Sequence, residues 1–142
     1  MSYKNQPHWV YVAGKVSDDT SSIQDVIAQF EQAGFEITHD WTRANGVGKP
    51  YLEHVERNQA AALDMQHGVQ LCEVFVLLCF GDIYGAMGEF GMALSAPPTN
   101  RLGRRLIYVV GDPIEMRQSI FFTLPGVWVC SSVEEVLADL GK

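Results

Sequence analysis

The sequence is poor in positive charge and contains no long apolar run. Ten Lys and Arg residues stand against seventeen Asp and Glu residues, which gives a net charge of −7. A chain of that charge has no broad positive field to neutralise a phosphate backbone, so a nucleic-acid polymer is excluded as a partner. No apolar run approaches the roughly 18 residues of a membrane span, and the first residues lack a signal-peptide core. We therefore expect a cytoplasmic protein that does not enter a membrane.

Cysteine is also scarce. Cys72, Cys79 and Cys130 are odd in number, lie in or beside apolar runs and form no C-x-x-C pair. This pattern predicts buried, reduced thiols. The four histidines do not combine with these cysteines at zinc-ligand spacing, and no His-Glu-x-x-His motif occurs. The sequence therefore predicts no metal site.

The rest of the composition is that of an ordinary globular protein. The chain has 142 residues, of which 47% are hydrophobic and 19% charged. This length fits a single domain over residues 1–142, which can bury roughly two thirds of its unfolded surface without a metal or a disulfide.

Apolar runs of strand length alternate with helical patterns along the chain. Strands are expected at 8–14, 35–41, 74–80, 105–111 and 126–130, and helices at 21–33, 50–72, 89–96 and 131–141. The run at 74–80, "VFVLLCF", is apolar throughout, as in a central strand covered on both faces. This alternation predicts a flavodoxin-like or Rossmann-like three-layer α/β/α sandwich with a five-stranded parallel sheet.

Ligands of such folds bind at the carboxyl ends of the strands, where we expect three loops to meet. They read "GKVSDD" (14–19), "DWTRANG" (40–46) and "GDIYGAMGE" (81–89). Glu89 ends the third loop between small residues. We expect it in the first turn of a helix, where the helix dipole would keep it ionised. It can stabilise that helix and nothing more, or it can serve as a nucleophile or cation stabiliser.

Other side chains could complete a site around Glu89. Asp64 and Asp40 would add carboxylates, which suit a cationic, oxocarbenium-like transition state, although acids in such positions are usually solvated surface. Aromatic residues near strand ends and loops could form the flat walls that a nucleobase needs, or they could be core packing. These residues are Tyr11, Trp41, Tyr84, Phe121 and Phe122.

The sequence does not contain the standard nucleotide-binding or serine-hydrolase motifs. Gly85, Gly88 and Gly91 are spaced G-x-x-G-x-x-G and follow the third strand, which differs from the dinucleotide fingerprint, and "GVGKPY" lacks the Ser or Thr of a P-loop. No serine has the setting of a hydrolase nucleophile.

Five segments together resemble the nucleoside 2-deoxyribosyltransferase-like family. They are "VYVAGKV", "THDW", "LDMQHGVQLCEVFVLL", "GAMGEFGMALS" and "SIFFTLPGVWVCSSVEEVL". The resemblance runs from about Trp9 to Leu140, and its most specific part is the glycine-flanked "GEFGMAL". Ile83 stands where family members place an acid or Ser, with Asp82 one step earlier. Asp64 precedes Glu73 by one residue more than the family interval, as a one-residue insertion near Gly68 would explain.

The resemblance implies that Glu89 attacks C1′ of a deoxyribonucleoside and expels the base, leaving a covalent glycosyl-enzyme. A second base or water then accepts the sugar. Tyr11 would orient Glu89, and Asp64 would contact the nucleoside and assist proton transfer. No cofactor is implied. Substrate-binding positions would be Gly14, Lys15, Ser17, Asp40, Trp41, Asp82, Gly85, Met87, Gly88, Met92, Ser119, Phe121 and Phe122.

Family sites are commonly completed by a neighbouring subunit, here through Ser119, Phe121 and Phe122, which implies a homodimer or larger assembly. The sequence thus favours an enzyme that acts on a nucleoside or nucleotide and a free nucleobase. Two alternatives stay open. One is a nucleoside 5′-monophosphate N-glycosidase in which Lys15 and Ser17 hold the phosphate. The other is a nucleotide-binding sensor without turnover.

Overall fold

The computed structural model describes residues 6–15, 19–44 and 47–142. Its centre is a parallel sheet of five strands in the order β2-β1-β3-β4-β5. The strands are β1 (Trp9–Ala13), β2 (Glu36–Ile37), β3 (Val74–Leu78), β4 (Leu106–Val110) and β5 (Val127–Cys130). This is the flavodoxin-like order, so the predicted three-layer fold is confirmed.

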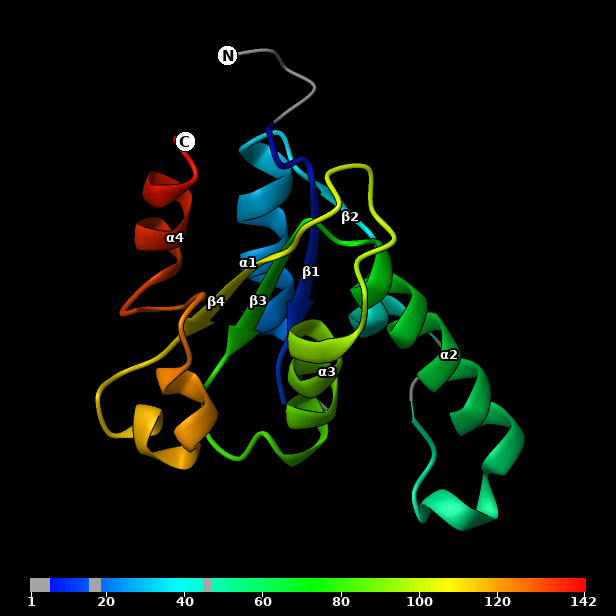
Figure 1. Ribbon diagram of the computed structural model, residues 1–142. Helices are drawn as coiled ribbons and strands as arrows, with labels where there is room; N and C mark the ends of the chain where they lie inside the picture. Colours follow the sequence, from blue (N-terminus) through cyan, green and yellow to red (C-terminus); the bar gives the residue numbers. More distant parts are fainter. Residues whose placement is uncertain (1–5, 16–18, 45–46) are drawn as a thin grey trace.

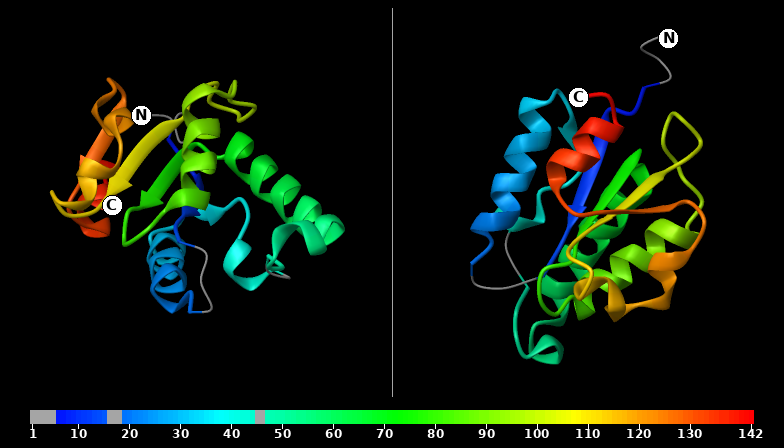
Figure 2. Two further views of the ribbon diagram at one scale, coloured as in Figure 1. Left: turned by 90° about the horizontal axis from the view of Figure 1, so that it is seen from below. Right: turned by 90° about the vertical axis from the view of Figure 1, so that its left-hand side faces the viewer.

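Four helices cover the sheet. They are α1 (Ser21–Gln32), α2 (Val55–Leu71), α3 (Tyr84–Ser95) and α4 (Val133–Asp139). Helices α1 and α4 lie on one face, and α2 and α3 lie on the other (Figures 1 and 2). Short 3₁₀ turns complete the connections: η2 (Trp41–Arg43), η3 (Tyr51–Glu53), η4 (Glu115–Gln118) and η5 (Ile120–Thr123). Because both faces are covered, all five residues of β3 are buried.

Three predicted boundaries differ from the structure. Strand β2 contains only Glu36 and Ile37. Phe35 before it packs edge-on against Phe30 at 5.6 Å between ring centroids, and after it Asp40 caps the 3₁₀ turn η2, which ends the extended segment. Helix α2 begins at Val55, after the 3₁₀ turn η3, and not near Pro50. Helix α3 begins at Tyr84, upstream of Glu89. The last difference matters most for the site, because it moves Glu89 out of the first turn.

The strand order places the switch point of the sheet between β1 and β3. The connections after these two strands run to opposite faces, to α1 after β1 and to α3 after β3, which opens a crevice at the carboxyl edge. Turns η4 and η5 follow β4 at that edge, where α3 also begins (Figure 1). In the described part of the chain, no helix combines the length and apolar character needed to cross a bilayer.

Candidate active site

The candidate active site is built on a buried pair, Tyr11 and Glu89. Tyr11 lies in the middle of β1 and is fully buried, and Glu89 lies in α3 with only 7% of its surface exposed. The Tyr11 hydroxyl donates a short hydrogen bond to Glu89 Oε2. The two residues are 78 positions apart in the sequence. The parallel crossover from β1 through β3 to α3 therefore creates this contact.

Burial controls the protonation of Glu89. Loss of solvent raises the pKa of its carboxyl group to about 7, although the hydrogen bond from Tyr11 pulls in the opposite direction. Burial also raises the pKa of Tyr11, and the negative charge of Glu89 raises it further. The tyrosine therefore stays a hydrogen-bond donor at all physiological pH values.

The expectation of a permanently ionised Glu89 is wrong. It assumed a first-turn position, but α3 begins at Tyr84 and has no acid in its first turn. The influence of the helix dipole falls off within that turn, so desolvation dominates for a residue in the second turn. A carboxyl group with a pKa near 7 exchanges its proton under physiological conditions, which is a property of catalytic groups.

The start of α3 leaves room beside Glu89. In a helix, side chains lean toward the N-terminus, so the Glu89 side chain leans over the preceding turn and toward the carboxyl edge of the sheet. Gly85 lies four residues before Glu89 on the same side of the helix. Both Gly85 and Gly88 are exposed, and a Cβ added to either would meet nothing within 4 Å. The glycines thus leave this surface open to a ligand.

Asp64 is exposed on α2, one helical turn before the buried Gly68. Positions i and i+4 share one side of a helix, and four residues span about 6 Å along its axis. Gly68 contacts the ring of Tyr11, since a Cβ at this glycine would lie 2.9 Å from Tyr11 Cδ2. Asp64 therefore lies on the side of α2 that faces the Tyr11–Glu89 pair, about one turn farther out.

The loop after β1 borders a small cavity at the carboxyl edge of the sheet. Lys15 is exposed and lines a cavity of about 110 Å³ together with Ser22 at the start of α1. The carboxylate of Asp19 also lines this cavity, where it accepts hydrogen bonds from Ser21. Gly14 is buried where β1 approaches α1. Ser17 lies outside the described residues.

Two predicted positions after β2 have local structural partners. Partial burial acts to raise the pKa of Asp40, but hydrogen bonds from Thr42 and Arg43 outweigh it and lower the pKa. Asp40 thereby caps η2. Trp41 is buried, and its indole N–H donates to the carbonyl oxygen of Val12 at 2.8 Å. Asp40 thus stabilises the loop after β2, and Trp41 holds that loop against β1.

The remaining predicted positions divide into exposed and packed groups. Asp82 is exposed, and Met87 and Met92 are half-buried against the core. Ser119 caps η5 by accepting a hydrogen bond from the backbone N–H of Phe121, whose side chain is 52% exposed. Phe122 is buried, and its ring packs edge-on against Phe90 at 5.3 Å between centroids. Of the two phenylalanines, Phe121 is the one that can meet another molecule.

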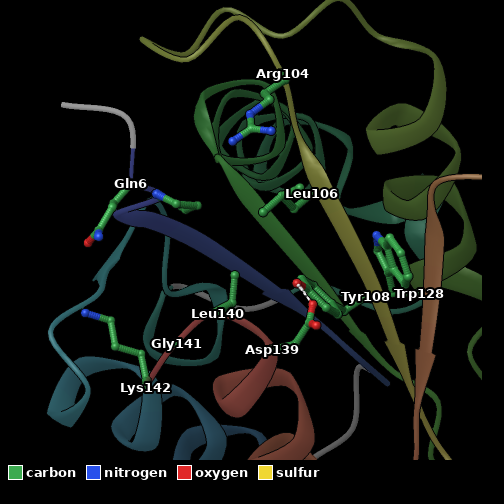
Figure 3. A pocket seen from close by; sticks show the side chains of 10 residues that line it. Gln6, Arg104, Leu106, Tyr108, Trp128, Asp139, Leu140, Gly141 and Lys142 are labelled. Atoms are coloured by element: carbon green, nitrogen blue, oxygen red, sulfur yellow. Dashed lines mark hydrogen bonds between the residues drawn. The ribbon is translucent and has the colours of Figure 1, made fainter. Parts of the chain in front are cut away.

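A separate groove lies at the amino edge of the sheet, away from the Tyr11–Glu89 pair. It measures about 570 Å³ and lies between α4 and the side chains of Leu106, Tyr108 and Trp128 on β4 and β5 (Figure 3). Within it, the Tyr108 hydroxyl donates to Asp139 at 2.6 Å beside the side chain of Trp128 (Figure 3). This second Tyr–carboxylate pair offers a natural control for the first, because it lies on the opposite face of the sheet, against α4.

Comparison with known proteins adds no family assignment. No protein-family model matches the chain, and no curated protein matches it significantly. Within the described residues, no group of three His, Cys, Asp or Glu side chains is arranged to hold a metal ion. The function of the chain is therefore inferred from the geometry of Tyr11, Glu89 and their surroundings.

Proposed function

We propose that the protein cleaves or transfers at the N-glycosidic bond of a nucleoside or deoxynucleoside, with Glu89 as the nucleophile. The observation that carries the proposal is the buried Tyr11–Glu89 hydrogen bond at the carboxyl edge of the sheet. The resemblance of the sequence to the nucleoside 2-deoxyribosyltransferase-like family supports the same assignment. The carboxyl group of Glu89 is almost fully shielded from solvent and has a pKa of about 7. This supports a covalent role, since its anion is weakly solvated.

In the first step, Glu89 attacks C1′ of the sugar as its carboxylate. Tyr11 holds Oε2, so we assign Oε1 to the new bond. The C1′–N bond breaks, and its electron pair leaves with the base, which takes up one proton through Asp64. The product is a glycosyl ester of Glu89. Positive charge develops on the sugar ring in this step, and a neighbouring carboxylate stabilises it.

In the second step, a nitrogen of another base or a water molecule attacks C1′. The ester bond breaks, and its electron pair returns to the Glu89 carboxylate. The proton that the acceptor loses passes to Asp64. Transfer and hydrolysis thus share one glycosyl-enzyme, and these steps require no cofactor.

The cavity beside Lys15 supports a nucleoside 5′-monophosphate N-glycosidase as the second candidate. A lysine together with the start of a helix of twelve residues suits a 5′-phosphate. The carboxylate of Asp19 in the same cavity opposes an anion there. A comparison of nucleosides with their 5′-monophosphates as substrates therefore decides between the two candidates.

The test is a reaction with deoxynucleosides and their 5′-monophosphates, with and without an acceptor base. Chromatography detects released or exchanged base, and mass spectrometry of acid-quenched protein detects the sugar ester. We expect Glu89→Gln to abolish both signals. The matched control is Asp139→Asn, because Asp139 also accepts a tyrosine hydroxyl. Turnover in the Gln variant would remove Glu89 from the mechanism, and ligand binding without turnover by the unaltered protein would favour a sensor.

We also propose that the protein forms a homodimer or larger assembly in the cytoplasm. Only Gly68 and Val69 of α2 are buried, and the helix projects from the body of the molecule (Figure 1). Exposed apolar side chains along this helix and in the preceding turn η3, Leu63 and Leu52 among them, support coverage by a second copy. Light scattering should give a mass of at least two chains, and Leu52→Asp with Leu63→Asp should give one. A monomer with full activity would refute a shared site.

A further inference from the structure

Gly68 lies near the end of α2 and is one of the two buried residues of that helix. Glycine is a poor residue for a helix interior, so its presence needs a reason in the packing. A Cβ at this position would lie 2.9 Å from Tyr11 Cδ2, 3.0 Å from Tyr11 Cε2 and 2.9 Å from His39 Cβ. These distances are too short for any side chain. The bare backbone of Gly68 therefore forms part of the surface that the Tyr11 ring packs against.

Two further contacts hold the ring in this place, and a third fixes the backbone of Gly68 beside it. Phe75 on the neighbouring strand lies parallel to Tyr11, with an interplanar angle of 3° and 6.0 Å between centroids. The Thr38 hydroxyl donates to the carbonyl oxygen of Gly68 at 2.8 Å, which ties α2 to the end of β2. At the tip of the ring, the Tyr11 hydroxyl donates to Glu89. Contacts at its edge, beside its face and at its tip thus define the position of the ring.

We propose that Gly68 is a positioning residue for the candidate active site, because its missing side chain lets the Tyr11 ring lie close enough to α2 for the hydroxyl to engage Glu89. The expected effect of Gly68 on the reaction rate rests on the proposed function. Its expected effect on the pKa of Glu89 does not, since that effect concerns only the Tyr11–Glu89 contact.

The main test is Gly68→Ala with the titration of the Glu89 carboxyl carbon followed by NMR. The methyl group must displace the Tyr11 ring or His39 Cβ, and neither is the free end of a flexible chain. The hydrogen bond from Tyr11 lowers the pKa of Glu89, so its loss should raise that pKa above about 7. We expect Tyr11→Phe to produce a shift of the same direction and size. In the Tyr11→Phe background, Gly68→Ala should add no further shift.

The matched control is Gly91→Ala. Gly91 is also a helix-interior glycine, in α3, but a Cβ there would meet nothing within 4 Å. This substitution should leave the titration of Glu89 unchanged. An unchanged titration in a folded Gly68→Ala variant would overturn the positioning role, whatever the activity. Absence of turnover in the unaltered protein would refute the proposed function and leave the positioning role standing.

The kinetic readout separates positioning from a merely structural role. We expect Gly68→Ala to lower kcat at pH 7 by about tenfold to a hundredfold, as small misplacements of catalytic groups do. The loss should shrink at higher pH, where Glu89 is ionised again. A loss of equal size at every pH would contradict the proposal.

If Gly68→Ala folds poorly, thermal unfolding still tests the steric argument. Tyr11→Leu removes the ring that the new methyl group meets. We expect alanine at position 68 to lower the melting temperature less in the Tyr11→Leu background than in the unaltered protein. An equal loss in both backgrounds would assign the clash to His39 alone and would overturn the role for Tyr11.

Discussion

Replacement of Tyr11 by Phe tests the central claim that one hydrogen bond sets the reactivity of Glu89. The substitution removes the hydroxyl that donates to Glu89 Oε2 and keeps the ring beside Phe75. Hydrogen bonds to charged groups contribute about 1.5–3 kcal/mol, and one pKa unit corresponds to about 1.4 kcal/mol. The variant should therefore raise the pKa of Glu89 by about one to two units from its value of about 7.

The rate follows from the ionised fraction. At pH 7 a carboxyl group of pKa about 7 is about half ionised, whereas at a pKa of about 8–9 the ionised fraction is about 1–10%. In the proposed reaction only the carboxylate attacks C1′, so kcat/KM at pH 7 should fall by about fivefold to fiftyfold. The acid limb of the pH profile should move upward by the same one to two units.

The assay is base release between pH 5 and 9.5 by the unaltered protein and the variant, with circular dichroism as a check on folding. The control is Tyr108→Phe, which removes a hydroxyl that donates to the carboxylate of Asp139 on the opposite face of the sheet. It should leave the acid limb in place. An unshifted acid limb in the Tyr11→Phe variant, or a kcat/KM that stays low at every pH, would refute the reasoning.

Three further predictions concern stability and are checked by urea unfolding. Burial raises the pKa of Glu89 from 4.5 to about 7, so the folded state binds the proton more tightly and its stability falls as pH rises between those values. The free energy of unfolding of Glu89→Gln, relative to that of the unaltered protein, should therefore rise by about 3 kcal/mol between pH 4.5 and pH 8. A constant difference would contradict the pKa shift. Glu73→Gln should lose about 2–4 kcal/mol, because the fully buried Glu73 carboxylate pairs with Arg101 at 2.9 Å; a neutral result would contradict this role. Phe122→Ala should lose about 3–4 kcal/mol and Phe121→Ala less than about 1 kcal/mol, since only Phe122 is packed in the core; equal losses would contradict the assignment.

The fold could be predicted because its signals are local. Apolar strand-length runs alternate with amphipathic segments, and the apolar run at 74–80 contains the buried strand β3. The start of α3 could not be read in the same way. Gly85 and Gly88 depress helix propensity, yet Ala86 and Phe90 are buried against the sheet. That burial outweighs propensity and extends the helix back to Tyr84.

The candidate site could be predicted only in part. The sequence pointed to Glu89 and Tyr11, but the proton affinity of Glu89 depends on burial by a distant strand, which no local pattern encodes. The adjacent Phe121 and Phe122 have the same side chain, and only the path of η5 makes one exposed and the other buried. Gly68 stands out in the helix pattern, because glycine disfavours a helix interior, but the open Gly91 of α3 shows that such a glycine need not mark a close approach. The sequence could not indicate that Tyr11 makes that approach.

The two buried glutamates of the fold show why Glu89 is better explained by chemistry than by structure. Glu73 is fully buried, and its charge is matched by Arg101 and by the backbone N–H groups of His8 and Trp9 at 2.6 and 3.1 Å. Glu89 is almost as buried, but in the described part of the chain it has no ion pair with Lys or Arg, and Tyr11 donates its hydrogen bond. A structural acid gains from the first arrangement, because pairing offsets the cost of burial. The second arrangement leaves the carboxylate costly to form and therefore reactive, which suits the attack on a sugar carbon that we propose for Glu89.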